Sequence, residues 1–192
     1  GPACRMFLAD AGAEVIKIER PQRGDDSRLF PPFKEGWSGS YVTLQRGKKG
    51  IALNMKESEG VEIFRELVKI SDVVVENMTP GTMTKLGLDY QSLKVLKEDI
   101  ILCSISGYGQ TGPLSPLPGY DSVIQAMSGI MSITGFPEGP PTRVGSLISD
   151  ISSAVFGAMG ICMALFYREK TGKGNLVDVS MFDVSLTLLA AN

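Results

Sequence analysis

The chain has 192 residues, of which 43% are hydrophobic, and its 19 basic and 21 acidic residues leave a net charge of −2. This length and composition predict one globular domain with a substantial core, and the balanced charge argues against a nucleic-acid partner, which needs a cationic face. The chain contains no histidine, so the commonest general base and metal ligand is missing from it.

The first half of the chain alternates short helical and strand patterns separated by breakers. In chain order we expect a helix at 2–11, a strand at 14–20, a polar loop at 21–40, a strand at 50–53, a helix that starts near 57, a strand at 72–77, short helices at 83–86 and 91–97, and a strand at 99–106. The strand at 72–77 has the clearest pattern.

The second half begins with a Gly- and Pro-rich loop at 107–119, and we expect helices near 120–131 and 150–168 and a strand at 176–179. The uncharged run 151–167 is just short of a bilayer span, so it is predicted to be a buried core helix and not a membrane crossing. Four methionines at helical spacing are likewise expected in the core. They are Met127, Met131, Met159 and Met163.

Apolar strands that alternate with helices predict an α/β fold, Rossmann-like, with a mostly parallel sheet and helices on both faces. Ligands collect at the carboxyl ends of the strands in such sheets. That rule makes candidates of Arg20, of Glu76 with Asn77, and of Ser104 with Ser106. For each of them, an ordinary polar group at a strand end is the alternative.

Two other patterns bear on ligands. Residues 107–112 match G-x-G-x-x-G, but the proline-rich residues 113–118 cannot open the helix that would bind a pyrophosphate, so no nicotinamide site is expected. Arg46, Lys48 and Lys49 lie beside flexible glycines, which suits either a phosphate-rich ligand or a solvated loop.

The three cysteines are widely spaced and form neither a zinc motif nor an even disulfide set, which favours a reducing, intracellular compartment.

Asp150 stands alone among small and apolar residues in the stretch 143–157. A carboxylate with an ordinary pKa near ~4 is ionised at neutral pH and can attack an acyl carbon with no base beside it. Asp150 is therefore a candidate nucleophile. The alternative is that Ser149 or Asp150 caps the following helix, for about 1 kcal/mol. Asp121, which opens a helix after Gly119, carries the same ambiguity between a cap and a site.

Several blocks in chain order resemble the class III CoA-transferase family, to which carnitine CoA-transferases and formyl-CoA transferases belong. The blocks are LAD at 8–10, GAEVIKIERP at 12–21, GD at 24–25, RGKK at 46–49, VVVEN at 73–77, PG at 80–81, LG at 86–87, SISGYGQTGP at 104–113, GYD at 119–121 and TGKG at 171–174. Because the match runs from the first residue to the last, residues 1–192 are similar to the family's large domain, and we expect them to be truncated at both ends and to lack the C-terminal half.

The resemblance implies a CoA-transferase that moves CoA between carboxylic acids with no metal and no permanently bound cofactor. The family's catalytic aspartate follows a Gly-Pro-Pro segment, which corresponds here to Asp150 after residues 139–141. It would form an aspartyl-acyl anhydride and then an aspartyl-CoA thioester. The CoA contacts implied by the family are Arg20, Leu53, Asn54, Met55, Lys56, Asn77, Met78 and Lys85, with Tyr120 and Asp121 in a further part of the pocket.

The partners implied by the resemblance are an acyl-CoA donor, a carboxylic acid acceptor and, in the full-length protein, a second copy in an interlocked homodimer. Neither nucleic acid nor membrane is expected, and the location would be cytoplasmic, or mitochondrial or peroxisomal in a eukaryote. The 192-residue chain alone is expected to be inactive. Two alternatives remain, an α-methylacyl-CoA racemase-like enzyme, which would want a histidine–acid pair that the chain lacks, and a non-catalytic CoA-binding fragment.

Overall fold

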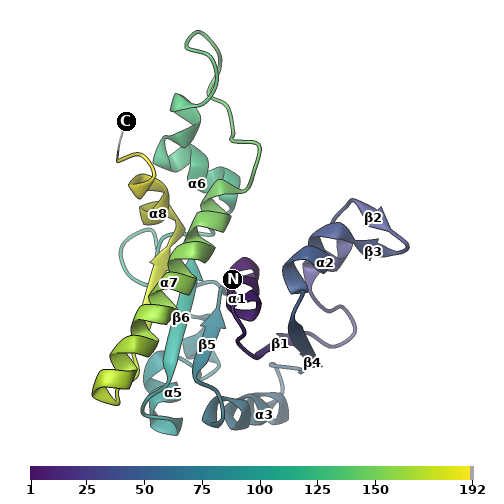
Figure 1. Cartoon of the computed structure of the whole chain (residues 1–192), viewed down its shortest axis with the longest axis vertical. Helices are drawn as coiled ribbons and strands as arrows, with labels where there is room; N and C mark the ends of the chain where they lie inside the picture. Colours follow the sequence, from purple (N-terminus) through teal and green to yellow (C-terminus); the bar gives the residue numbers. More distant parts are fainter. Residues whose placement is uncertain (191–192) are drawn as a thin grey trace.

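The computed structural model describes residues 1–190, and parallel strands with helices packed on them form its frame (Figure 1). The strands are β1 (Val15–Glu19), β2 (Phe33–Lys34), β3 (Trp37–Ser38), β4 (Lys48–Ala52), β5 (Val73–Glu76), β6 (Ile101–Ser106) and β7 (Leu176–Ser180). The helices are α1 (Pro2–Asp10), α2 (Gly39–Gln45), α3 (Ser58–Lys69), α4 (Thr82–Lys85), α5 (Tyr90–Leu96), α6 (Asp121–Ser128), α7 (Ile148–Thr171) and α8 (Met181–Thr187), with short 3-10 helices η1 (Asp26–Leu29) and η2 (Ile130–Ile133).

The strands form two parallel sheets and one hairpin. Strands β5, β6 and β7 make a three-stranded parallel sheet in that order, β1 and β4 make a parallel pair, and β2 and β3 are antiparallel. The predicted α/β fold with parallel strands is therefore confirmed. The strands are divided between two parallel sheets, however, and α1 lies between the two in Figure 1.

Helices cover both faces of the three-stranded sheet. All six residues of β6 are buried, because β6 is the central strand. Cys103 and Ile105 face a cluster formed with α1 and α7, whereas Leu102 faces a cluster formed with α3 and α5. Each aliphatic side chain buried in this way contributes about 1.5–3 kcal/mol to the stability of the fold. Strand β6 therefore joins the helices on the two faces of the sheet.

The region from 21 to 45 differs most from the prediction. The predicted polar loop contains η1 and the β2–β3 hairpin, and α2 begins at its end. Both helical segments start at a capped residue, because Asp25 accepts a hydrogen bond from the amide of Ser27 and Ser38 accepts one from the amide of Tyr41. Such local caps stabilise short helices that apolar periodicity does not reveal.

Helix α7 is long and apolar enough to cross a membrane by length and composition alone, which for a single helix is weak evidence. Its small residues pack against α1, β6 and β7. Its other face is exposed, and Met163 is 64% exposed. The expectation that the helical methionines lie in the core is wrong for Met127, Met159 and Met163, which are all exposed, because apolar residues continue around more than one face of these helices.

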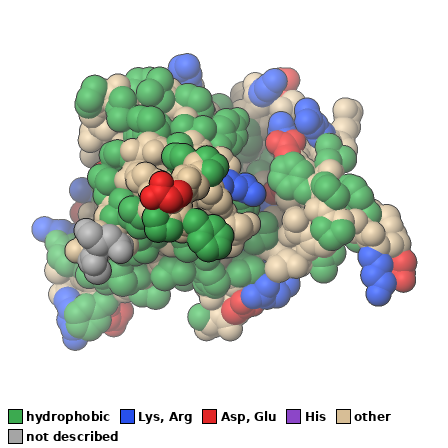
Figure 2. All heavy atoms as spheres, turned by 90° about the horizontal axis from the view of Figure 1, so that it is seen from above, with side chains coloured by type: hydrophobic (Ala, Val, Ile, Leu, Met, Phe, Trp, Pro, Cys, Tyr) green, Lys and Arg blue, Asp and Glu red, His purple; other side chains and the backbone are tan. Residues whose placement is uncertain are grey.

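Apolar side chains also gather at the end of the molecule where α6 and α8 lie. In Figure 2 hydrophobic atoms dominate this part of the surface, whereas charged groups are more frequent over α2 and the hairpin. Val123, Ile133 and Phe136 are among the exposed side chains there. Extended apolar surface of this kind is typical of a protein interface.

Gly60 in α3 has no room for a side chain, because an ideal Cβ there would lie 2.1 Å from the backbone oxygen of Asn54. Alanine favours a helix over glycine by about 1 kcal/mol, but this overlap is with backbone and overpacking costs about 1–3 kcal/mol. We therefore expect Gly60→Ala to lower the free energy of unfolding by about 1–2 kcal/mol in a urea titration. In Gly50→Ala, the control, the new Cβ meets nothing within 4 Å. Equal effects of the two substitutions would contradict this packing.

Candidate functional site

Asp150 lies in the first turn of α7. The helix begins at Ile148, and its N-cap residue is Leu147, which makes no side-chain hydrogen bond to the helix. Neither Ser149 nor Asp150 is therefore the N-cap residue, and the capping explanation for these two residues is wrong. The side chain of Asp150 reaches solvent, so its carboxylate is accessible to a ligand.

The amides at the start of α7 are bound by Asp121 of α6. Oδ1 of Asp121 accepts hydrogen bonds from the amide of Ser149 at 2.9 Å and from the amide of Asp150 at 3.1 Å. Its Oδ2 accepts a hydrogen bond from Nε2 of Gln125 at 2.5 Å. Asp121 and Gln125 are 5% and 0% exposed. Asp121 thus caps a helix to which it does not belong, while its predicted place in a CoA pocket stays a prediction.

Gln125 is a residue that the sequence analysis missed. Its Oε1 accepts a hydrogen bond from the amide of Val144 at 2.9 Å, so it holds the segment that leads into α7. One signal was available, because Gln125 follows Asp121 by four residues and therefore shares its helix face. A polar residue at that spacing in a predicted core helix indicates a partner inside the protein.

The charges around Asp150 shift its titration. Desolvation raises the pKa of its carboxyl group, and the negative charge of Asp121 raises it further. Burial likewise raises the pKa of Glu76. An ideal Cβ on Gly1 would lie 2.0 Å from Oδ1 of Asn77. Asn77 therefore packs against Gly1, the N-cap residue of α1.

The candidates at the ends of β5 and β6 are neighbours. Glu76 pairs in register with Ser104, and Oε2 of Glu76 accepts a hydrogen bond from the amide of Met78 at 2.7 Å. The hydroxyl of Ser106 is buried and has no hydrogen-bond partner. After β6 the chain remains a loop until α6 begins at Asp121, as the proline content predicts.

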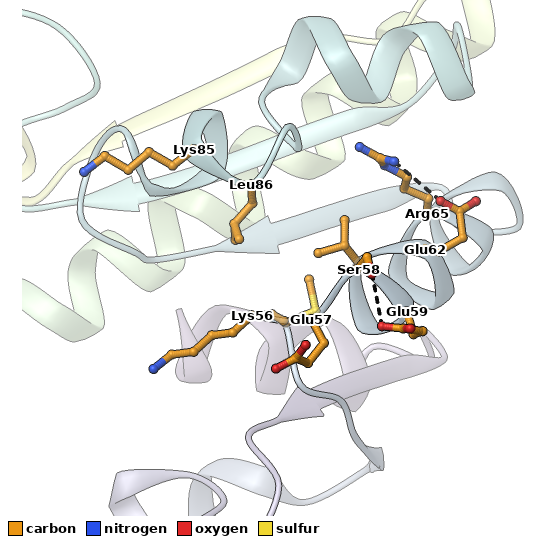
Figure 3. Close-up of a pocket in the computed structure, with 10 residues that line it drawn as sticks. Lys56, Glu57, Ser58, Glu59, Glu62, Arg65, Lys85 and Leu86 are labelled. Atoms are coloured by element: carbon orange, nitrogen blue, oxygen red, sulfur yellow. Dashed lines mark hydrogen bonds and ion pairs between the residues drawn. The ribbon is translucent and has the colours of Figure 1, made fainter.

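Three of the predicted CoA contacts, Met55, Lys56 and Lys85, line one pocket of about 610 Å³ beside the start of α3. In Figure 3 Lys56 and Lys85 extend toward the same side of the pocket, and the charged side chains of α3 lie on the other side. Glu59 and Glu62 are among the latter. Glu57 and Arg65 also line this pocket, so its charges are mixed, and the two lysines are the part that would hold a phosphate group.

Arg20 lines a different pocket, of about 400 Å³. It forms an exposed ion pair with Asp26 at 2.7 Å. Beneath it, Nζ of the buried Lys17 lies 3.1 Å from Oε1 of Glu19 and 2.6 Å from Oδ2 of Asp25. This buried network fixes the loop that carries Arg20. Arg20 and Lys85, predicted to hold the same ligand, thus line two separate pockets.

The remaining predicted contacts differ in what they can offer a ligand. Leu53 is buried and donates its amide to the backbone oxygen of Glu19 at 3.0 Å. Asn54 uses Oδ1 to accept from the amide of Lys56 at 3.2 Å, which shapes the turn before α3. Asn77, Met78 and Tyr120 are exposed, as is Lys56. The exposed residues can bind a ligand directly, whereas the side chain of Leu53 belongs to the core.

Within residues 1–190, no group of three or more His, Cys, Asp and Glu side chains is placed to hold a metal ion. The cysteines in that range are free thiols. Cys4 and Cys103 are buried, and Cys162 is exposed.

Comparison with known proteins relates the whole chain to one family. The family model described as CoA-transferase family III matches residues 1–192. The chain is 48% identical over 190 residues to the acetyl-CoA:oxalate CoA-transferase of Acetobacter aceti, covering 98% of this chain and 49% of that protein. It is 44% identical over 191 residues to the succinyl-CoA:glutarate CoA-transferase of Homo sapiens, covering 99% and 44%.

Comparison with solved structures supports the same relationship. A CAIB/BAIF family protein from Brucella suis superposes with a TM-score of 0.94 and 41% sequence identity, covering 98% of this chain and 51% of that one. The chain spans about half the length of the curated relatives it matches.

The network around Lys17 makes stability depend on pH. Burial opposes the ionisation of Glu19, but hydrogen bonds from Arg28, Lys17 and Tyr41 lower its pKa to about 2, and the pKa of Asp25 is also lowered to about 2. The folded state therefore gains stability from both carboxylates above their ordinary pKa values near ~4, and loses it as the pH falls toward 2. We expect Lys17→Met to lower the free energy of unfolding at pH 7 by about 3–5 kcal/mol and to weaken this acid dependence.

Lys49→Met is the control, because Lys49 pairs with Glu14 at 3.0 Å on the surface, where both side chains are exposed. Such a pair contributes about 0–1 kcal/mol. Urea titrations at pH 7 and at lower pH measure both variants. Similar losses for Lys17→Met and Lys49→Met would show that the buried network does not stabilise the fold.

Proposed function

The chain belongs to CoA-transferase family III, and from that premise we propose that, within a longer protein, it supplies the nucleophile and much of the CoA site of an enzyme that moves CoA between carboxylic acids. The observation that carries the proposal is the placement of Asp150. It is an accessible carboxylate in the first turn of α7, and a buried carboxylate of another helix binds its amide. The chain offers no imidazole, and a carboxylate nucleophile needs no base.

The chemistry proceeds as two matched exchanges. The carboxylate of Asp150 attacks the acyl carbon of the donor thioester, the C–S bond breaks, and CoA leaves as a thiolate from an aspartyl-acyl anhydride. The thiolate then attacks the aspartyl carbonyl carbon. This breaks the anhydride C–O bond, releases the donor as a free carboxylate and leaves an aspartyl-CoA thioester.

The second exchange repeats these steps in reverse order. The acceptor carboxylate attacks the aspartyl thioester, expels the thiolate and forms a second anhydride, and the thiolate attacks the acceptor acyl carbon to give the product acyl-CoA. Asp150 is regenerated as a carboxylate. Each intermediate keeps the free energy of the thioester, whereas hydrolysis would lose it, so the site must exclude water while the reaction proceeds.

CoA binding is assigned to the cationic side chains of the two pockets. Lys56 and Lys85 face the same side of one pocket, and Arg20 lies in the other. Asn77, Met78 and Tyr120 are exposed side chains that can contact the rest of the ligand. Lysine and arginine are the usual partners of phosphate groups, and a CoA molecule carries three of them.

The remaining parts of the proposal concern the longer protein. Its partners would be an acyl-CoA donor, a carboxylic acid acceptor and a second copy in an interlocked homodimer. The exposed apolar faces of α6, α7 and α8 fit such burial in an interface. The three cysteines, of which two are buried free thiols and one is exposed, fit a reducing intracellular compartment.

We expect Asp150→Asn to reduce CoA transfer by the full-length protein at least about 1,000-fold, since the amide keeps the shape of the side chain but cannot act as the nucleophile. CoA affinity should change little. Initial rates with acetyl-CoA or succinyl-CoA as donor and oxalate or glutarate as acceptor, the acyl groups in the relatives' names, measure the effect. The control is Asp183→Asn, which changes the aspartate in the equivalent position of the first turn of α8. Retention of a tenth of the wild-type rate by Asp150→Asn would sink the assignment.

Removal of a phosphate-binding charge should weaken CoA binding without affecting the nucleophile. Isothermal calorimetry with CoA is expected to show a loss of about 1.5–3 kcal/mol for Arg20→Ala and for Lys85→Ala, the range for a hydrogen bond to a charged group. Lys94→Ala, on the exposed surface of α5, is the matched control. Unchanged affinity in both site variants would rule out these two pockets as the nucleotide site.

A further inference from the structure

The carboxylate of Asp121 lies at the start of two helices, α6 and α7. Asp121 is the first residue of α6, and its Oδ1 binds the first-turn amides of α7 through two hydrogen bonds of 2.9 and 3.1 Å. Free amides and the helix dipole make each helix N-terminus favourable for negative charge. Asp121 satisfies two amides of α7 from a different helix, so it joins α6 to the turn that carries Asp150.

Gln125 extends this connection to the chain before α7. Its Nε2 donates to Oδ2 of Asp121 at 2.5 Å, and its Oε1 accepts from the amide of Val144 at 2.9 Å. Both side chains are buried. Together they bind the backbone at both ends of the segment from residue 144 to residue 150, and the hydrogen bond that joins the two side chains is buried.

We propose that Asp121 and Gln125 are a positioning pair for the reaction, which fixes the backbone from which the Asp150 carboxylate reaches the acyl carbon. The proposal rests on the nucleophilic role assigned to Asp150 above. In a nucleophilic attack the reacting atoms must approach with defined distance and angle, and a misplacement of about 1 Å can cost about 100-fold in rate. Asp150 makes no cap of its own, so the bond from Asp121 to its amide is the restraint closest to the reacting group.

The charge of Asp121 gives the pair a second measurable effect. Desolvation raises the pKa of Asp150, and among the described residues the charged side chain that raises it further is Asp121 on α6. Loss of the charge at residue 121 should therefore lower the pKa of Asp150. Because the ionised form attacks, the acid limb of the rate profile would move to lower pH.

Three variants of the full-length protein separate geometry from charge. Asp121→Ala removes both the hydrogen bonds and the charge. The double variant Asp121→Asn with Gln125→Glu restores the bonds to Ser149, Asp150 and Val144 and the bond between the two side chains, because the asparagine oxygen accepts from the α7 amides, its NH₂ donates to the glutamate, and the glutamate accepts from Val144. It loses only the long bond of 3.4 Å from residue 125 to the backbone oxygen of Ser146. In this variant the negative charge moves one side chain away from Asp150. Asp89→Ala is the control, since Asp89 caps α5 through the amide of Ser92 at 3.0 Å.

Asp121→Ala is expected to lower kcat about 100-fold and to speed hydrogen exchange of the amides of Ser149 and Asp150 at least about tenfold, by mass spectrometry of a peptide that spans them. The double variant should keep kcat within about fivefold of wild type and keep the slow exchange, while its acid limb shifts to lower pH. Asp89→Ala should lose stability and keep kcat and its pH profile.

Two results would overturn the proposal. One is an Asp121→Ala variant with wild-type kcat, and the other is a double variant with slow exchange, wild-type-like stability and an unshifted acid limb. Hydrogen exchange needs no substrate, so it tests whether the positioning pair restrains α7 even if the wild-type protein transfers no CoA. In that case the proposed function fails while the restraint on α7 is still measured.

Discussion

The position of the candidate nucleophile depends on one interaction, the binding of the α7 amides by the carboxylate of Asp121. It places Asp150 in a turn that is held from outside its own helix, at 2.9 and 3.1 Å. A buried carboxylate without partners would cost several kcal/mol, but here its oxygens are engaged by two backbone amides and by Gln125. The same negative charge raises the pKa of Asp150. The interaction that fixes the position of Asp150 therefore also disfavours its ionised form.

The candidate nucleophile and Arg20 are carried by two different parallel sheets. The three-stranded sheet carries α7 on one face and α3 on the other, whereas Arg20 is carried by the β1–β4 pair and its buried Lys17 network. Between the two sheets lies α1 (Figure 1), whose N-cap residue Gly1 packs against Asn77. The proposed ligand, CoA, matches this division in kind, because its nucleotide and its thioester lie at opposite ends of the molecule.

Local signals in the sequence predict the elements and several site residues, and they do not predict contacts between distant segments. Breakers and apolar runs place most helices and strands within a few residues, and the isolation of Asp150 marks it as a candidate nucleophile. The cap on α7 joins residues 28 and 29 positions apart, so it is visible only in the folded chain. The division into two sheets depends on strand pairing, which apolar periodicity does not specify. The exposed methionines were mispredicted because periodicity identifies an apolar face without showing what covers it.

The most direct test of Asp150 as the nucleophile follows an oxygen atom from the acceptor acid to the protein. The full-length protein is incubated with an unlabelled acyl-CoA donor and an acceptor acid whose carboxyl oxygens are ¹⁸O, then digested and analysed by mass spectrometry. If Asp150 passes through an anhydride with the acceptor, the bridging oxygen stays on its carboxyl group when the thiolate attacks the acceptor carbon. The peptide that contains Asp150 should then gain the mass of ¹⁸O, and fragmentation should place it on that residue. Product acyl-CoA formed without label on Asp150, or with label on another carboxylate, would contradict its role as the nucleophile.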